Sequence, residues 1–139
     1  MSVQVDVVYE GHLKCKAAHG PSGAAVTTDA PTDNGGKGEL FSPTDLVGAA
    51  LGACVLTILG LVADRHGWSL AGSTARVVKE MVATPVRRIG SLKTVVTVAG
   101  GAKLSPEDRK RLEAALDACP VKKSLHPDVA VPIEYVYIG

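Results

Sequence analysis

Apolar and polar positions alternate in short segments on both sides of one long uncharged run. No charged side chain stands between Asp45 and Asp64. Ser42 can cap a helix, Asp45 three residues later completes a capping box, and Gly67 is a typical helix stop. The pattern therefore predicts a helix of about six turns that is apolar on every side, with Cys54 near its middle.

The segments before this helix alternate in a way that is typical of half-buried strands. A turn at Glu10-Gly11 separates the first two segments and predicts a β-hairpin. In the second segment Leu13, Cys15 and Ala17 share one face, so we expect Cys15 to be a packed, inert thiol. The predicted strands are the segment with Val3, Val5 and Val7, residues 12–18 and residues 24–28, followed by a turn-rich loop at 29–41.

The second half of the chain predicts more strands and one amphipathic helix. Residues 69–83 and 89–99 are rich in Val and Thr and predict two long antiparallel strands. Ser105 then opens a helix whose apolar stripe includes Cys119. Residues 133–138 predict the last strand.

Length and charge exclude several classes of protein. At 139 residues the chain is predicted to form one domain, residues 1–139. The net charge is +1 and the Lys and Arg residues are scattered, so we expect no nucleic-acid partner. The N-terminal sequence does not resemble a signal peptide, and three cysteines in such a chain indicate the reducing cytoplasm. Any disulfide would then be transient.

The uncharged run also reaches the lower length limit of a transmembrane helix. However, it is rich in Gly and Ala rather than in Leu, and it lacks aromatic anchors on its N-terminal side. Small residues let another backbone approach closely. We therefore expect a buried core helix that another element crosses tightly, and no membrane association.

Few residues remain that could carry chemistry. The sequence has no CxxC or HxxxH spacing and its histidines do not cluster, so no metal site is predicted. It also lacks glycine motifs that bind phosphates or dinucleotides, so we expect no cofactor. Cys54 and Cys119 remain, either as two small core residues or as a dithiol that cycles between thiol and disulfide.

Two stretches carry a resemblance to a known family. FSPTDLVGAALGACVLTIL around Cys54 and LDACPVKKSL around Cys119 resemble the osmotically inducible protein C and organic hydroperoxide resistance (OsmC/Ohr) family, in its OsmC-like branch. The order of the predicted elements is similar along nearly the whole chain. The resemblance implies an α+β fold with antiparallel strands packed around two central helices. It also implies an intertwined homodimer with active sites at the subunit interface.

The activity that this resemblance implies is a thiol-dependent peroxidase that reduces organic hydroperoxides. Cys54 would be the peroxidatic cysteine, whose thiolate attacks the peroxide and becomes a sulfenic acid. Cys119 would be the resolving cysteine, which condenses with Cys54 to a disulfide. A dithiol reductant such as a lipoylated protein would then restore both thiols.

Burial disfavours a thiolate, so the peroxidatic cysteine needs a nearby cation. The resemblance implies an arginine upstream of the helix, held by an acidic residue at the helix start. Asp45 or Glu39 fits the acidic residue, but this chain has no upstream arginine. We expect Arg87 or Arg88, between the two long strands, to replace it. The other candidates are Lys14, Lys16, Lys37 and His19.

The missing arginine favours a second hypothesis from another class of function. The same fold would then be a non-catalytic protein that binds a small apolar ligand at the dimer interface. Its cysteines would be ordinary core residues.

Overall fold

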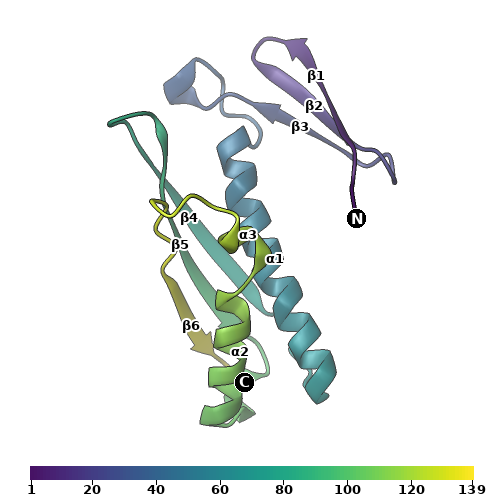
Figure 1. Cartoon of the computed structure of the whole chain (residues 1–139), viewed down its shortest axis with the longest axis vertical. Helices are drawn as coiled ribbons and strands as arrows, with labels where there is room; N and C mark the ends of the chain where they lie inside the picture. The colour runs from purple at the N-terminus through teal and green to yellow at the C-terminus, as the bar shows by residue number, and fades with distance from the viewer. The chain divides into compact units, whose positions relative to one another are not determined.

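The computed structural model describes all 139 residues as two compact units, Met1–Val47 and Gly48–Gly139. Helix α1, Pro43–His66, begins in the first unit and continues through the second. Figure 1 shows the elements of both units.

The first unit contains a three-stranded antiparallel sheet in the order β1-β2-β3. The turn between β1 and β2 differs from the prediction, since the second strand begins at Lys14 rather than at His12. Gly11, His12 and Leu13 have φ angles of 87°, 55° and 63°. Gly11 is the last residue of β1, and the left-handed backbone of His12 and Leu13 forms the turn. The strands are β1 (Val5–Gly11), β2 (Lys14–His19) and β3 (Ala25–Asp29).

The loop after β3 contains a short 3-10 helix, η1 (Thr32–Asn34), and is tied together by backbone hydrogen bonds. Asp29 N donates to Phe41 O (3.0 Å), so the two ends of the loop meet. A Cβ on Gly36 would lie 1.8 Å from Ala30 O, which only glycine avoids. The loop therefore delivers the chain to the start of α1 in a fixed direction.

The predicted capping box of α1 is confirmed. Ser42 N donates to Asp45 Oδ2 (2.9 Å) and Asp45 N donates to Ser42 Oγ (3.1 Å). At the other end Gly67 adopts a φ of 70°, and Trp68 N donates to Ala63 O (2.9 Å). These contacts are local in sequence, which explains why both ends of the helix could be predicted.

The second unit contains a three-stranded sheet in the order β4-β5-β6. The long pair β4 (Thr74–Val82) and β5 (Arg88–Val98) is antiparallel, as predicted. The last strand, β6 (Ile133–Tyr137), lies parallel to β5, which departs from the expected all-antiparallel arrangement. A parallel neighbour needs a crossover connection. Here it consists of η2 (Gly101–Lys103), α2 (Pro106–Asp117) and α3 (Pro120–Lys123).

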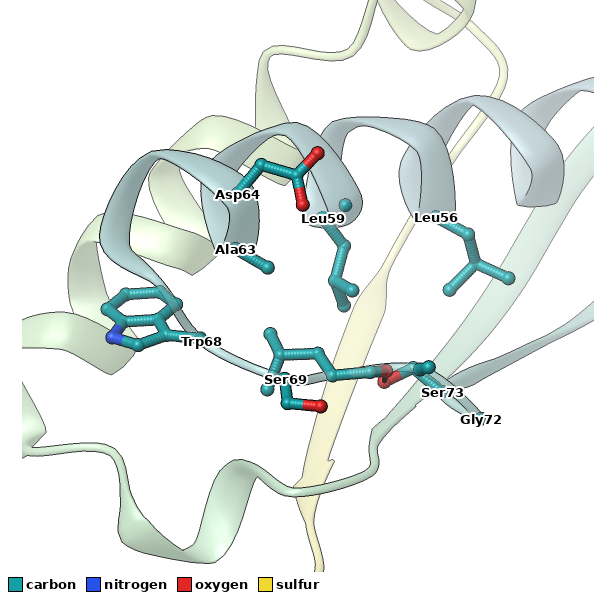
Figure 2. Close-up of a pocket in the computed structure, with 11 residues that line it drawn as sticks. Leu56, Leu59, Ala63, Asp64, Trp68, Ser69, Gly72 and Ser73 are labelled. Carbon is teal, nitrogen blue, oxygen red and sulfur yellow. Dashed lines mark hydrogen bonds between the residues drawn. The ribbon is translucent and has the colours of Figure 1, made fainter.

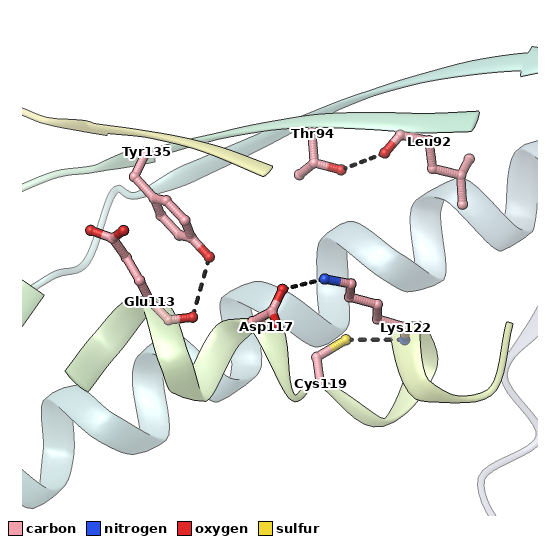
Figure 3. A network of polar contacts seen from close by, with 7 residues as sticks. All are labelled: Leu92, Thr94, Glu113, Asp117, Cys119, Lys122 and Tyr135. Atoms are coloured by element: carbon pink, nitrogen blue, oxygen red, sulfur yellow. Dashed lines mark hydrogen bonds and ion pairs between the residues drawn. The ribbon is translucent and has the colours of Figure 1, made fainter. Parts of the chain in front are cut away.

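Both long helices cover the same face of this sheet (Figure 3). Helix α1 lies against β4, because a Cβ on Gly52 would be only 3.4 Å from Val77 Cγ2. This close approach confirms the predicted use of small residues. Helix α2 covers β6, where Tyr137 Oη donates to Glu113 Oε2 (2.6 Å). The buried core of the unit includes Leu51, Val55, Leu59, Leu92, Val96, Val98, Leu112 and Leu116. The α+β fold class is thus confirmed.

Candidate functional site

The two cysteines of the second unit are neighbours in space. Cys54 is half-buried in the fourth turn of α1, next to the fully buried Val55. Cys119 is 0% exposed and lies between α2 and α3. Both are free thiols, and the side chain of Cys54 interacts directly with that of Cys119. The fold thus brings together two sulfurs that lie far apart in the sequence.

Cys119 is the N-cap residue of α3, and its sulfur accepts the backbone N–H of Lys122 at 3.4 Å (Figure 3). Burial is the largest influence on this thiol and raises its pKa. The Lys122 N–H opposes that rise, whereas hydrogen bonding to Cys54 and charge on Cys54 add to it. The net effect is a raised pKa for Cys119. Hydrogen bonding to Cys54 thus favours the protonated form of Cys119.

The expected cations lie at the N-terminal end of β5. Arg87 immediately precedes the strand, and Arg88 is its first residue. Arg87 is exposed in the turn. Arg88 is half-buried, and its Nη1 donates to Ile89 O (2.9 Å) and Asp128 O (3.4 Å). Arg88 thereby joins the strand to the segment before β6. The role of either arginine as the activating cation stays a prediction.

The two acidic candidates both belong to the first unit. Asp45 closes the capping box of α1. Glu39 lies in the loop before α1, and its Oε2 is 3.7 Å from Lys14 Nζ. One of the expected acids is thus paired with one of the expected alternative cations. Whether either acts on a thiol stays a prediction.

Asp29 is a residue that the sequence analysis missed. Its side chain is 1% exposed, lies 3.1 Å from Lys14 Nζ and accepts the backbone N–H of Glu39 at 3.2 Å. Burial alone would raise the pKa of Asp29, but the Glu39 N–H and Lys14 outweigh it and hold the pKa below its usual value. The only sequence signal was an acidic residue at the end of a strand, before a glycine-rich loop.

Cys15 lies in β2 of the first unit, half-buried, between Tyr9 on β1 and Thr28 on β3. No group of three or more His, Cys, Asp or Glu side chains is arranged to hold a metal ion.

The second unit also contains a cavity of about 400 Å³ at the C-terminal end of α1 (Figure 2). Its apolar lining includes Leu56, Leu59 and Trp68, and Asp64 and Ser69 contribute polar atoms. His66 stacks on Trp68 with ring centroids 4.4 Å apart. Neither Cys54 nor Cys119 lines this cavity, so it is separate from the dithiol.

The chain is similar in sequence and in fold to known proteins. The family model described as OsmC-like protein matches residues 36–134. A crystal structure from Psychrobacter arcticus, provisionally described as an osmotic stress induced and detoxification response protein, has 40% sequence identity and a TM-score of 0.87. It covers 94% of this chain and 93% of its own. The search of curated proteins gave no match.

Two more distant structures share the fold. An organic hydroperoxide resistance protein OsmC from Legionella pneumophila has 17% identity and a TM-score of 0.77, covering 98% of this chain and 97% of its own. An OsmC-like protein from Mycoplasma pneumoniae has 14% identity and a TM-score of 0.82, covering 100% and 99%.

Proposed function

The chain belongs to the OsmC-like protein family, and from this membership and its two neighbouring thiols we propose that it reduces organic hydroperoxides. The observation that carries the proposal is the direct interaction of Cys54 with Cys119, both as free thiols. A pair of core cysteines needs no such contact. A peroxidase that closes a disulfide in each cycle does need it.

In the first step the Cys54 thiolate attacks one oxygen of the hydroperoxide. The O–O bond breaks, Cys54 becomes a sulfenic acid, and the organic part leaves as an alcohol after taking up a proton. Cys54 suits this step because it is the more exposed of the two thiols, whereas burial raises the pKa of Cys119.

In the second step the Cys119 thiolate attacks the Cys54 sulfur. The S–O bond breaks, water leaves after proton uptake, and a Cys54–Cys119 disulfide forms. An external dithiol, such as a lipoylated protein, would reduce this disulfide and return both thiols. Such a cycle fits the reducing cytoplasm, which we propose as the location of the protein.

We propose further that the protein acts as a single domain in a homodimer, with the active site completed at the subunit interface. Apolar side chains are exposed on β1 and on α1, including Val5, Val7 and Leu61. By length and composition α1 could span a membrane, and 39% of its apolar window is buried. A second subunit would cover the part of α1 that one chain leaves exposed. Asp45, Glu39, Arg87 and Arg88 are the candidates to complete the site around Cys54.

The test is reduction of tert-butyl hydroperoxide with dihydrolipoamide as the reductant. The wild-type protein should turn over, and Cys54→Ser should abolish peroxide consumption. Cys119→Ser should turn over more slowly, because its sulfenic acid cannot be resolved within the chain and has to be reduced directly by dihydrolipoamide. Cys15→Ser is the matched control and should keep the wild-type rate. Full turnover by Cys54→Ser would overturn the proposal.

A second candidate function is binding of a small apolar ligand without catalysis. It is favoured by the absence of arginine from the first unit and by the cavity beside Trp68, which Leu56 and Leu59 also line. Under this hypothesis the wild-type protein would leave the hydroperoxide intact, and Trp68 fluorescence would change on titration with an apolar ligand.

A further inference from the structure

Asp117 and Lys122 form an ion pair that spans the turn holding Cys119. Asp117 is the last residue of α2, and Lys122 lies in the short helix α3 (Figure 3). Lys122 Nζ contacts Asp117 Oδ1 directly. The pair therefore closes a loop of a few residues with Cys119 inside it.

The same lysine contacts Cys119 through its backbone. Lys122 N donates to Cys119 Sγ at 3.4 Å, and Lys123 N donates to Cys119 O at 3.0 Å. Helix α3 has only 4 residues, and a helix this short does not hold its shape without tertiary contacts. The side chain of Lys122 supplies such a contact, so the position of its N–H depends on the ion pair.

The position of Asp117 is unfavourable for α2 itself. A negative charge at a helix C-terminus opposes the helix dipole, and α2 has no basic residue in its last turn. The Asp117 side chain is also 60% exposed, so the pair contributes little to global stability. Asp117 therefore stabilises the turn around Cys119 rather than helix α2.

We propose that Asp117 and Lys122 are positioning residues for Cys119, and that their ion pair sets the rate at which Cys119 closes the disulfide with Cys54. The inference rests on the dithiol of the proposed function, but not on the peroxide step. When the pair is intact, the Lys122 N–H stabilises the Cys119 thiolate and holds its sulfur in the orientation that faces Cys54. When it is broken, α3 loosens and the attacking thiolate is less often formed and less often aimed.

The step can be measured without a peroxide by using 4,4′-dithiodipyridine in the Cys15→Ser background. The Cys54 thiolate attacks the reagent, its S–S bond breaks, and one thiopyridone leaves. The Cys119 thiolate then attacks the Cys54 sulfur of the mixed disulfide, releasing a second thiopyridone and forming the Cys54–Cys119 bond. The two releases are separate absorbance phases, and the second reports on Cys119 alone.

The variants are Asp117→Asn and Lys122→Gln, with Arg111→Gln as the matched control. Arg111 is also on α2 and pairs with Asp108 at 3.4 Å. Both test variants should keep the first release and slow the second by about two- to tenfold, the range given by the net free energy of one hydrogen bond. The pH profile of the second release should move to higher pH, since the thiolate has lost support. Asp117→Glu should recover most of the rate, and Arg111→Gln should behave as wild type.

The thermal midpoint of Asp117→Asn should stay equal to or above the wild-type value, which separates positioning from a structural role. A second release that is unchanged in rate and pH profile in both variants would overturn the inference. Two normal releases in a protein that does not consume hydroperoxide would count against the proposed function alone. Loss of the second release from the wild type would overturn both.

Discussion

The Cys119 thiol lies against Cys54 in the second unit, and it is the more deeply buried of the two. This relationship separates the roles of the two sulfurs. The half-buried thiol is the one that a peroxide can reach, whereas the buried thiol can meet only its neighbour. The order of the two chemical steps follows from that difference in access.

The first prediction concerns the product of this pair. Mild treatment with one equivalent of organic hydroperoxide should produce a disulfide between Cys54 and Cys119 of one chain, because the two thiols are already neighbours. Peptide mass spectrometry after alkylation should find Cys15 still reduced. A crosslink through Cys15 as the main product would contradict the assignment.

The second prediction concerns Asp29 and the pH dependence of stability. Its pKa is lowered from the ordinary 3.8, so the ionised form is favoured by folding. The stability it contributes is therefore fully present above about pH 3.8 and is lost as the pH falls through the lower folded-state pKa. Asp29→Asn should be less stable than wild type at pH 7, and this difference should shrink as the pH falls below 3.8. Urea unfolding at pH 7 and pH 3 measures it, and a difference that is independent of pH would refute it.

Local contacts explain what could be predicted from the sequence. The capping box of Ser42 and Asp45 and the stop at Gly67 join residues a few positions apart, so their spacing predicts the helix ends. In contrast, Gly11 signals a turn but not how far it extends, because a positive φ at a residue such as Leu13 is unusual.

Contacts that depend on register or topology could not be predicted. Lys14 and Asp29 pair because β2 and β3 align them as direct partners. No local pattern shows that alignment. Likewise, the parallel direction of β6 depends on where α2 and α3 return the chain. The contact between Cys54 and Cys119 was expected only from a family resemblance, because their spacing alone favours two small core residues.

The third prediction contrasts two glycines of the second unit. A Cβ on Gly60 in α1 would meet no atom within 4 Å, so Gly60→Ala should stabilise the protein by about 0.5–1 kcal/mol through helix propensity. A Cβ on Gly101 would lie 2.7 Å from Val98 Cγ1 and 2.9 Å from Tyr137 Cδ1. Gly101→Ala should therefore destabilise by about 1–3 kcal/mol. Denaturant midpoints at an unchanged m-value measure both effects, and the same sign for both would contradict the packing argument.

The fourth prediction concerns the cation beside Cys54. If Arg87 or Arg88 stabilises the thiolate, its replacement by Gln should slow hydroperoxide reduction by about tenfold or more at pH 7, the effect of one pKa unit. The loss should be smaller at alkaline pH, where thiolates form unaided. Arg76→Gln, on the neighbouring strand β4, is the control. Wild-type rates at pH 7 in both variants would place the cation elsewhere, and Lys14→Met would be the next variant to measure.

The last prediction concerns the surface that one chain leaves apolar. Leu61 is 48% exposed in the C-terminal half of the apolar helix α1, and Val7 is 62% exposed on β1. A stable homodimer should bury more than about 1,000 Å² in total, and exposed apolar side chains such as these two are available for it. Light scattering at micromolar concentration should give twice the 14.3 kDa chain mass.

Leu61→Glu should shift the protein toward monomer and lower its thermal midpoint, because a charge would then face the partner. Arg65→Gln, on the same helix, should leave the mass unchanged. A folded wild-type monomer would contradict the dimer, and co-sedimentation of that monomer with lipid vesicles would instead assign the exposed face of α1 to a membrane.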